Sequence, residues 1–213
     1  MVAASLLFAV TALFTPPRLI SGDPPGLAPP NVVAGGEVLV EATVDKTGAV
    51  SRAILIRNTP PYGQMVLDAV KHWRFTPAHD LGEDGRDEAV ESSVLIAAVY
   101  RSPTLMNGPT VGTAPVDVSR PSSAAPYPVV MSPPVHPIQA PSAGVVLLEV
   151  SLDEAGITRA IRTVRSNPGL DAAARDAVGK WNFRGASFRS RPVASRAYVI
   201  VGFPEPILNS PVQ

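Results

Sequence analysis

Hydrophobic and polar residues alternate along two stretches of the chain, residues 36–45 ("GEVLVEATVD") and 144–153 ("GVVLLEVSLD"). Such an alternation, sustained over about eight residues, predicts a strand that buries one face. Each stretch ends in an aspartate with a glycine three residues later ("DKTG" and "DEAG"), which is the chemistry of a hairpin turn. A second strand is expected to follow through 49–57 and through 157–165.

A helix is expected after each pair of strands. Thr59 and Asn167 each precede a proline, and a capping residue followed by proline is typical of a helix start. Apolar residues then recur at the spacing of one helical face, at Val66, Ala69, Val70 and Trp73 in the first unit and at Ala174, Ala177, Val178 and Trp181 in the second. We expect each tryptophan to seal its helix onto the strands. A last apolar strand follows at 90–100 and at 193–203.

The two units are copies of one another. Residues 36–75 align with 144–183 without a gap, and 13 of the 40 positions are identical. The identical pairs are Gly36/Gly144, Val38/Val146, Leu39/Leu147, Glu41/Glu149, Asp45/Asp153, Gly48/Gly156, Arg57/Arg165, Pro60/Pro168, Asp68/Asp176, Ala69/Ala177, Val70/Val178, Trp73/Trp181 and Phe75/Phe183. The spacing is longer than the roughly 20–50 residues of a solenoid repeat, so it indicates a duplicated small domain.

The expected fold class is α+β, with two tandem ββαβ domains at 36–102 and 143–204. Each domain is expected to be a small antiparallel sheet with one helix packed on a face. Residues 103–142 contain ten prolines and few charges, which predicts an extended, semi-rigid linker between the domains. Residues 21–35 form a similar proline-rich segment, and 205–213 form a tail.

The first 20 residues carry an apolar run from Val2 to Phe14. The run is shorter than the roughly 20 residues that a spanning helix needs. Three hypotheses remain open: a signal peptide without the usual positive start, the end of a truncated membrane anchor, or a buried apolar arm. The first two both imply export across the inner membrane of a bacterium.

Composition and motifs disfavour several classes of function. Lys and Arg number 18, as do Asp and Glu, so no excess of positive charge favours nucleic acid. The chain has no cysteine, its three histidines share no metal spacing, and no nucleophile motif or phosphate loop occurs. We therefore expect no catalytic residues, no metal, no cofactor and no enzymatic activity.

Two weaker signals have competing interpretations. Asp80, Asp84, Gly85 and Glu91 fall at four positions of a calcium-binding loop, although Gly82 stands where a ligand is needed, so a solvated acidic hairpin loop is the simpler interpretation. The matched pair Arg57 and Arg165 near the end of each second strand is either a contact to a partner peptide or an exposed charge.

The ordered set of residues resembles the C-terminal domain of the TonB family. The first copy fits with Gly36, Val38, Val40, Val44, Asp45, Gly48, Val50, Asp68, Ala69, Val70, Trp73, Phe75 and Pro77. The second fits with Gly144, Val146, Leu148, Leu152, Asp153, Gly156, Asp176, Ala177, Val178, Trp181 and Phe183, but has Gly185 in place of the proline. Two glycines, the tryptophan and the Phe75 or Phe183 position form the structural signature of each copy, and the two copies cover roughly 130 residues.

The resemblance implies a periplasmic protein that binds a partner peptide as an added strand. Its N-terminus either anchors it to the inner membrane or does not. In the family this binding couples an inner-membrane proton-channel complex to a peptide of an outer-membrane transporter. Free sheet edges bind peptides through backbone hydrogen bonds, and the candidate edges are 92–100 and 195–203. The expected binding residues are Tyr198, Val199, Ile200, Val201 and Phe203, and pairing of edge strands would also permit a homodimer.

Three departures separate this chain from the family. Residues 1–20 lack the histidine that couples the family's anchor to its motor, and the linker is nearly uncharged. A Tyr-Pro element usually precedes the first strand; Tyr127-Pro128 matches it for the second copy, and the first copy shows none. Two hypotheses follow: an energy transducer, or a periplasmic scaffold with two TonB-like modules and no motor.

Overall fold

A computed structural model describes residues 13–27, 35–82, 84–101, 114–137 and 143–205. The expectations for the start of the N-terminal leader or anchor (1–12) and for the tail (206–213) lie outside the described residues. The same holds for residues 28–34 of the first proline-rich segment and for two parts of the proline-rich linker, 103–113 and 138–142.

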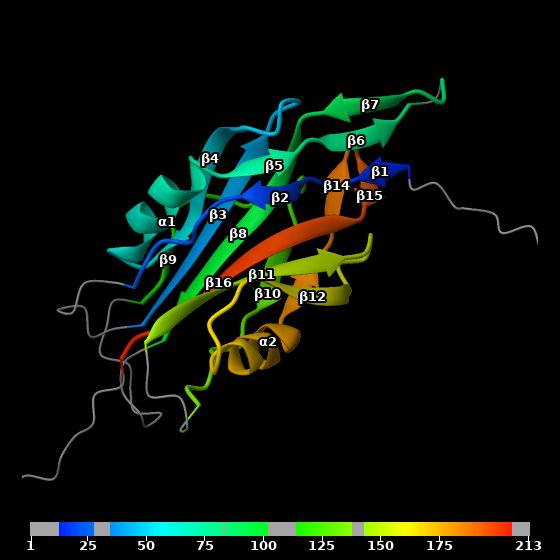
Figure 1. Cartoon of the computed structure of the whole chain (residues 1–213). Coiled ribbons are helices and arrows are strands. Elements are labelled where there is room, and N and C mark those ends of the chain that lie inside the picture. The colour runs from blue at the N-terminus through cyan, green and yellow to red at the C-terminus, as the bar shows by residue number, and fades with distance from the viewer. Residues whose placement is uncertain (1–12, 28–34, 83, 102–113, 138–142, 206–213) are drawn as a thin grey trace, which may run out of the picture.

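Sixteen strands and two helices make up the described structure (Figure 1). In chain order they are β1 (Phe14–Thr15), β2 (Arg18–Ser21), β3 (Gly36–Val44), β4 (Val50–Asn58), α1 (Tyr62–Val70), β5 (Arg74–Thr76), β6 (Ala78–Leu81), β7 (Asp87–Val90), β8 (Ser92–Tyr100), β9 (Val116–Asp117), β10 (Tyr127–Val130), β11 (Gly144–Leu152), β12 (Thr158–Arg165), α2 (Asp171–Gly179), β13 (Asn182–Arg184), β14 (Ala186–Phe188), β15 (Arg191–Val193) and β16 (Ser195–Phe203).

The expectation of two small separate ββαβ domains is wrong. Of the described residues 51% are in strands and 11% in helices, and both copies contribute to one seven-stranded mixed sheet. Its order is β12-β11-β16-β8-β3-β4-β9, so the last strand of each copy lies in the middle. We call 13–101 the first repeat and 114–205 the second repeat.

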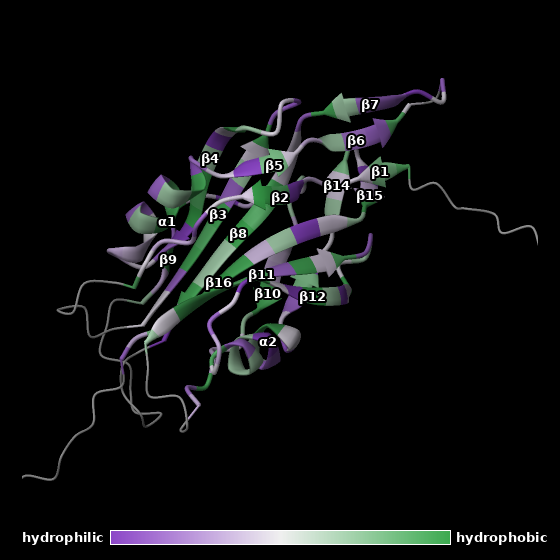
Figure 2. Cartoon of the chain, in the orientation of Figure 1, coloured by the Kyte–Doolittle hydropathy of each residue, from purple (hydrophilic) through white to green (hydrophobic). Residues whose placement is uncertain are grey.

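The two repeats join through parallel pairing of β8 with β16, from Leu95 opposite Ala197 to Tyr100 opposite Gly202. Each of these strands is also paired on its other side, β8 with β3 and β16 with β11. Their sequences, "SSVLIAAVY" and "SRAYVIVGF", are nearly continuous apolar runs. Such runs suit strands that are buried on both faces, as parallel strands usually are; Figure 2 shows this apolar centre.

The two helices cover opposite faces of the sheet, α1 over β3 and β4 and α2 over β11 and β12 (Figure 1). We call these the α1 face and the α2 face. The core on the α1 face includes Leu147, Tyr198 and Ile200 of the second repeat. The core on the α2 face includes Leu39, Leu95 and Ala97, among others, of the first repeat. Because each core draws on both repeats, neither repeat can complete its own core alone.

The hairpin turns confirm the sequence-based prediction. Asp45 Oδ1 accepts hydrogen bonds from Thr47 N (2.8 Å) and Ala49 N (3.1 Å), and Gly48 has φ +84°. In the second repeat, Asp153 Oδ1 accepts from Ala155 N and Ile157 N, and Gly156 also has φ +84°. Positive φ favours glycine because it lacks a Cβ atom. The side-chain hydrogen bond from Thr47, followed by the backbone hydrogen bonds from Thr47 and Ala49, lowers the pKa of the Asp45 carboxyl.

The predicted helix caps are wrong. The helices begin after Pro61 and Leu170, and neither of these cap positions makes a side-chain hydrogen bond to the helix. Thr59 instead binds the first strand: its Oγ1 accepts from Glu37 N (3.1 Å) and donates to Glu37 O (3.2 Å). The side chain that the sequence pattern assigned to the helix start therefore binds the backbone of β3 instead.

Each repeat begins with an extended segment that precedes its first long strand. The tryptophan of the repeat is buried between this segment and the rest of the repeat. We call these segments the first arm (13–27) and the second arm (114–137). Trp73 Nε1 donates to Asp23 O (3.0 Å) in the first arm, and Trp181 Nε1 donates to Ser132 O (2.9 Å) in the second. Each tryptophan thus contacts its arm as well as packing in the same core as its helix.

The arms contribute strands to both repeats. β2 pairs with β5 in the first repeat, and β10, which contains Tyr127-Pro128, pairs with β13 in the second. β2 therefore takes the place of the Tyr-Pro element that the first copy lacks in sequence. Phe14 of β1 joins a third small core with the hairpins β6–β7 and β14–β15. Neither helix in the described part of the chain is long and apolar enough to cross a membrane.

Candidate partner-binding site

The residues expected to form a free binding edge lie at the centre of the sheet instead. Tyr198, Val199, Ile200, Val201 and Phe203 are at most 1% exposed. Their strand, β16, is paired with β11 on one side and β8 on the other. The other candidate edge, 92–100, forms β8 and is enclosed in the same way. Neither strand has a free edge, so the assignment of these segments as edges is corrected.

One end of the sheet is covered by the second arm. β9 pairs antiparallel with β4, with Asp117 opposite Arg57 and Val116 opposite Asn58. Beyond β9, Val118 N (2.8 Å) and Ser119 N (3.2 Å) both donate to Ile56 O. The molecule has thus added an extended segment to the end of β4.

The other end of the sheet is the outer side of β12. No strand in the described ranges pairs with this side, so β12 is the terminal strand of the sheet. Its sequence, "TRAIRTVR", carries three arginines whose side chains are 65% (Arg159), 47% (Arg162) and 55% (Arg165) exposed. Positive charges on an edge strand discourage indiscriminate pairing with other strands.

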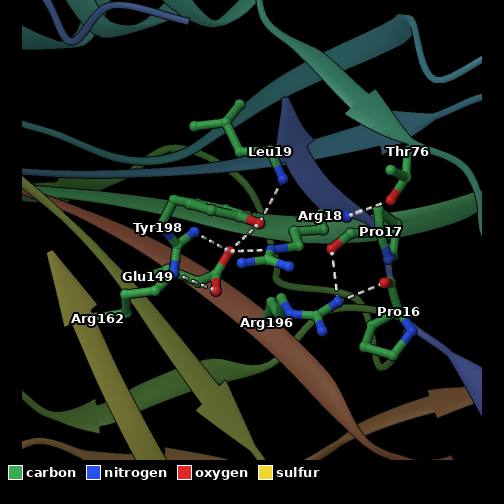
Figure 3. Close-up of polar contacts among 9 residues, drawn as sticks. All are labelled: Pro16, Pro17, Arg18, Leu19, Thr76, Glu149, Arg162, Arg196 and Tyr198. Atoms are coloured by element: carbon green, nitrogen blue, oxygen red, sulfur yellow. Dashed lines mark hydrogen bonds and ion pairs between the residues drawn. The ribbon is translucent and has the colours of Figure 1, made fainter. Parts of the chain in front are cut away.

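A buried carboxylate lies beside β12 on the α1 face (Figure 3). Glu149 of β11 is 5% exposed, and its two carboxylate oxygens accept hydrogen bonds from Arg162 Nε and NH2, both at 3.2 Å. Tyr198 donates its hydroxyl to Glu149 Oε2 (3.0 Å) and accepts from Leu19 N (2.7 Å) in the first arm. Arg18 Nε lies 3.9 Å from the same oxygen.

These contacts determine the charge of the cluster. Burial opposes the charge of Glu149, but the hydrogen bonds from Arg162 and Tyr198 and the charges of Arg162 and Arg196 outweigh it, so the pKa of the carboxyl is lowered. Burial, and then the charge of Glu149, raise the pKa of Tyr198. Glu149 therefore stays ionised and Tyr198 protonated at neutral pH, which preserves their hydrogen bond.

The cluster attaches the first arm to the second repeat. Arg196 NH1 donates to the carbonyls of Pro16 and Pro17, as Figure 3 shows. Arg165 forms an ion pair with Asp23 of the same arm. Together with the bond from Leu19 N to Tyr198, these contacts attach the arm at three places along its length.

The first repeat is held in a corresponding way by the second arm. Arg57, the counterpart of Arg165, binds Asp117 (Nε–Oδ1 2.8 Å) and donates through NH2 to the Tyr127 hydroxyl (3.3 Å). Glu41, the counterpart of Glu149, accepts from Ser122 N (3.1 Å) and from the Ser122 hydroxyl. Each matched arginine and glutamate therefore contacts the arm of the other repeat.

The sequence analysis missed the Glu149 cluster, although the repeat contained a signal. Glu41 is flanked in the sheet by Ile54 and Leu95. Glu149 is flanked at the same places by Arg162 and Tyr198. A glutamate kept in both copies, with polar neighbours in only one, distinguishes the second copy chemically from the first.

The acidic hairpin loop is used structurally. Asp80 is 3% exposed and is paired with Arg191 NH2 (2.8 Å) of β15 and with Arg189 NH1 (3.3 Å) of the turn before it. Its carboxylate is therefore a link between repeats. Within the described residues, no group of three or more His, Asp or Glu side chains could hold a metal ion.

Replacing Glu149 with glutamine is expected to lower the free energy of unfolding by about 2 kcal/mol at pH 7, since hydrogen bonds to a charged group contribute about 1.5–3 kcal/mol. A carboxyl with a lowered pKa stabilises the fold above its unfolded-state pKa, here near 4.5, and loses that contribution as pH falls through the folded-state value. The difference in the free energy of unfolding between wild type and E149Q should therefore become smaller below about pH 4.5. Urea denaturation from pH 7 to pH 3 measures it.

Glu41→Gln is the matched control, because Glu41 is only partly buried and its hydrogen bonds from described residues come from Ser122. We expect E41Q to cost less than E149Q at pH 7. An E149Q deficit that stays constant down to pH 3 would contradict an ionised Glu149 as the source of the stability.

Comparison with family models found no match, and comparison with curated proteins found none either.

Proposed function

We propose that this chain is a TonB-like binding protein of the bacterial cell envelope, which takes up an extended segment of a partner protein as an additional strand. The observation that carries the proposal is the outer side of β12, at one end of the seven-stranded sheet, which pairs with no strand among the described residues. An open edge offers backbone N–H and C=O groups to an extended peptide with little demand on its sequence.

The opposite end of the same sheet supports this mode of binding. There β9, a segment from outside the ββαβ unit, lies antiparallel on β4 and uses backbone hydrogen bonds together with one ion pair. The repeat therefore accepts an added segment at its second strand. In the second repeat the equivalent strand is β12.

Two versions of the function remain proposals. In the first, the protein couples an inner-membrane proton-channel complex to an outer-membrane transporter. In the second, it is a periplasmic scaffold without a motor. The N-terminal segment favours the scaffold, because Phe14, the end of the apolar run, is 7% exposed and packs in the core with Phe188. A residue that the fold buries is not available to a membrane anchor.

Photo-crosslinking in the native bacterium tests the proposal. A photoreactive amino acid at exposed Ala160 on β12 is expected to capture an envelope protein, whereas the same group at exposed Glu88 on β7 is not. Capture at position 160 of an outer-membrane β-barrel, with a proton-channel complex recovered from the same cells, would support the transducer. Capture of other envelope proteins alone would support the scaffold. Identical products from both positions would contradict binding at β12.

A further inference from the structure

The outer edges of β4 and β12 carry the same features at the same positions. Each strand has a matched arginine near its end, Arg57 and Arg165, and each has a register shift one residue before it, at Ile56 and at Val164. A bulge of this kind turns a backbone group out of the regular ladder. In the first repeat the carbonyl of Ile56 accepts hydrogen bonds from Val118 N and Ser119 N. Val164 O is the equivalent acceptor in the second repeat.

We propose that the outer edge of β12 binds an extended segment with an acidic residue, in the antiparallel register that β9 adopts on β4. The acidic side chain then pairs with Arg165, and the two following backbone N–H groups donate to Val164 O. The inference rests on the proposed function and specifies its partner: a segment recognised by one carboxylate and by its backbone.

Arg57 and Arg165 differ in the number of groups they bind and in their exposure to solvent. Arg57 binds Glu37, Asp117 and Tyr127 with three different nitrogens, and its side chain is 24% exposed. Among the described residues, Arg165 is paired only with Asp23, through NH2, and it is 55% exposed. Arg57 binds Asp117 through Nε, whereas the ion pair of Arg165 with Asp23 is formed through NH2.

The covered edge also shows which features of a partner matter. Val116 and Val118 flank Asp117 and are 53% and 51% exposed, so their side chains add little burial. Recognition on β4 therefore depends on the backbone and on the carboxylate. All three arginines of β12 have an acidic partner within the chain, but only Arg165 lies next to the register shift, at the position where Arg57 binds Asp117 in the first repeat. Arg165 is therefore the group placed to select an acidic residue.

A second copy of β12 does not fit this site. Its sequence, "TRAIRTVR", contains no acidic residue and three arginines, so it cannot supply a carboxylate to Arg165 and would bring like charges together. The partner is therefore an acidic segment of another protein rather than the same edge of another copy.

The test uses a peptide that copies residues 114–121 ("APVDVSRP") and a second peptide in which its aspartate is replaced by arginine. The full-length, 15N-labelled protein is titrated with each, and binding is followed by NMR. The acidic peptide is expected to shift the amides of residues 163–166 and to slow their hydrogen exchange. Arg165→Glu should weaken this binding at least about 5-fold, since an exposed ion pair contributes up to about 1 kcal/mol and reversal adds repulsion. The arginine peptide should then bind R165E better than it binds wild type.

Arg159→Glu is the matched control, because it makes the same charge reversal on an exposed arginine at the opposite end of β12. R159E should bind the acidic peptide within about 2-fold of wild type, and Arg165→Gln, which avoids a new charge beside Asp23, should show an intermediate loss. Equal affinity of R165E and wild type, shifts confined to β4, or no binding of the acidic peptide would each overturn the inference. The crosslinks from position 160 are independent of this peptide, so they show separately whether binding by strand addition fails.

Discussion

Replacing Trp73 with alanine is expected to destabilise both repeats, although Trp73 belongs to the first. The side chain is fully buried, and loss of a buried tryptophan costs about 3–5 kcal/mol. Its ring contacts Tyr198 of the second repeat edge-on, with centroids 6.2 Å apart. Because the repeats share one sheet and both cores, the cost should appear in the unfolding of the whole chain. Fluorescence of Trp181, the only tryptophan left in W73A, reports the second repeat.

Trp73→Phe is the control, since it also leaves Trp181 as the only fluorophore but keeps an aromatic ring in the core. The midpoint of thermal unfolding read at Trp181 should be lower in W73A than in W73F by roughly 4–8 °C, which corresponds to about 2 kcal/mol in a chain of this length. The reciprocal pair, W181A and W181F, read at Trp73, should show the same coupling. Equal midpoints in W73A and W73F would mean that the two repeats unfold independently.

Local structure could be predicted well from the sequence because local chemistry determines it. The alternation from Val38 to Val44 corresponds to β3, and the aspartate–glycine spacing corresponds to hairpin turns with Gly48 and Gly156 at positive φ. The helical stripe around Val66 and Val70 corresponds to α1. Each of these patterns depends on contacts within a few residues, which the sequence contains directly.

The union of the two sheets was not predicted because it depends on pairing across about 100 residues. One signal was present: β8 and β16 do not alternate, and an unbroken run such as "AYVIVG" is typical of a strand buried on both faces. This apolar run was predicted to be a binding edge, and it is instead enclosed on both sides. An edge strand that faces water on one face would instead show the alternation seen in β3.

The packing of the two arms on the repeats could not be predicted from their composition. Prolines in 13–27 and 114–137 indicate extended chain, and both segments are largely extended. Composition does not reveal that an extended chain packs against a distant tryptophan. Trp73 binds the backbone carbonyl of Asp23, and Trp181 binds that of Ser132. Every residue type has such a carbonyl, so the sequence does not indicate these contacts. Only the matched positions of these contacts in the folded repeats reveal the arms as part of the domain.

Removal of the first 23 residues is expected to destabilise the protein strongly, whereas removal of the first 12 leaves every described contact in place. The longer truncation removes β1 and β2, including Phe14 and Leu19, which are 7% and 8% exposed. Burial of such side chains contributes about 1.5–3 kcal/mol each. Trp73 Nε1 also loses its acceptor, and the Tyr198 hydroxyl loses its donor. After allowance for the chain entropy regained, we expect a loss of about 3 kcal/mol and a melting temperature lower by roughly 6–12 °C.

Single substitutions in β2 test the same contact if the longer truncation aggregates. Leu19→Ala should cost about 2–5 kcal/mol, whereas Ile20→Ala, one residue further along the strand and 67% exposed, should cost less than about 1 kcal/mol. Equal stability of L19A and I20A would show that the arm does not pack on Tyr198. If L19A is the less stable, an intact fold requires Leu19 of the first arm, and any leader peptide would have to be cleaved before that residue. Sequencing the N-terminus of the mature protein from cells would then distinguish a cleaved leader from a retained arm.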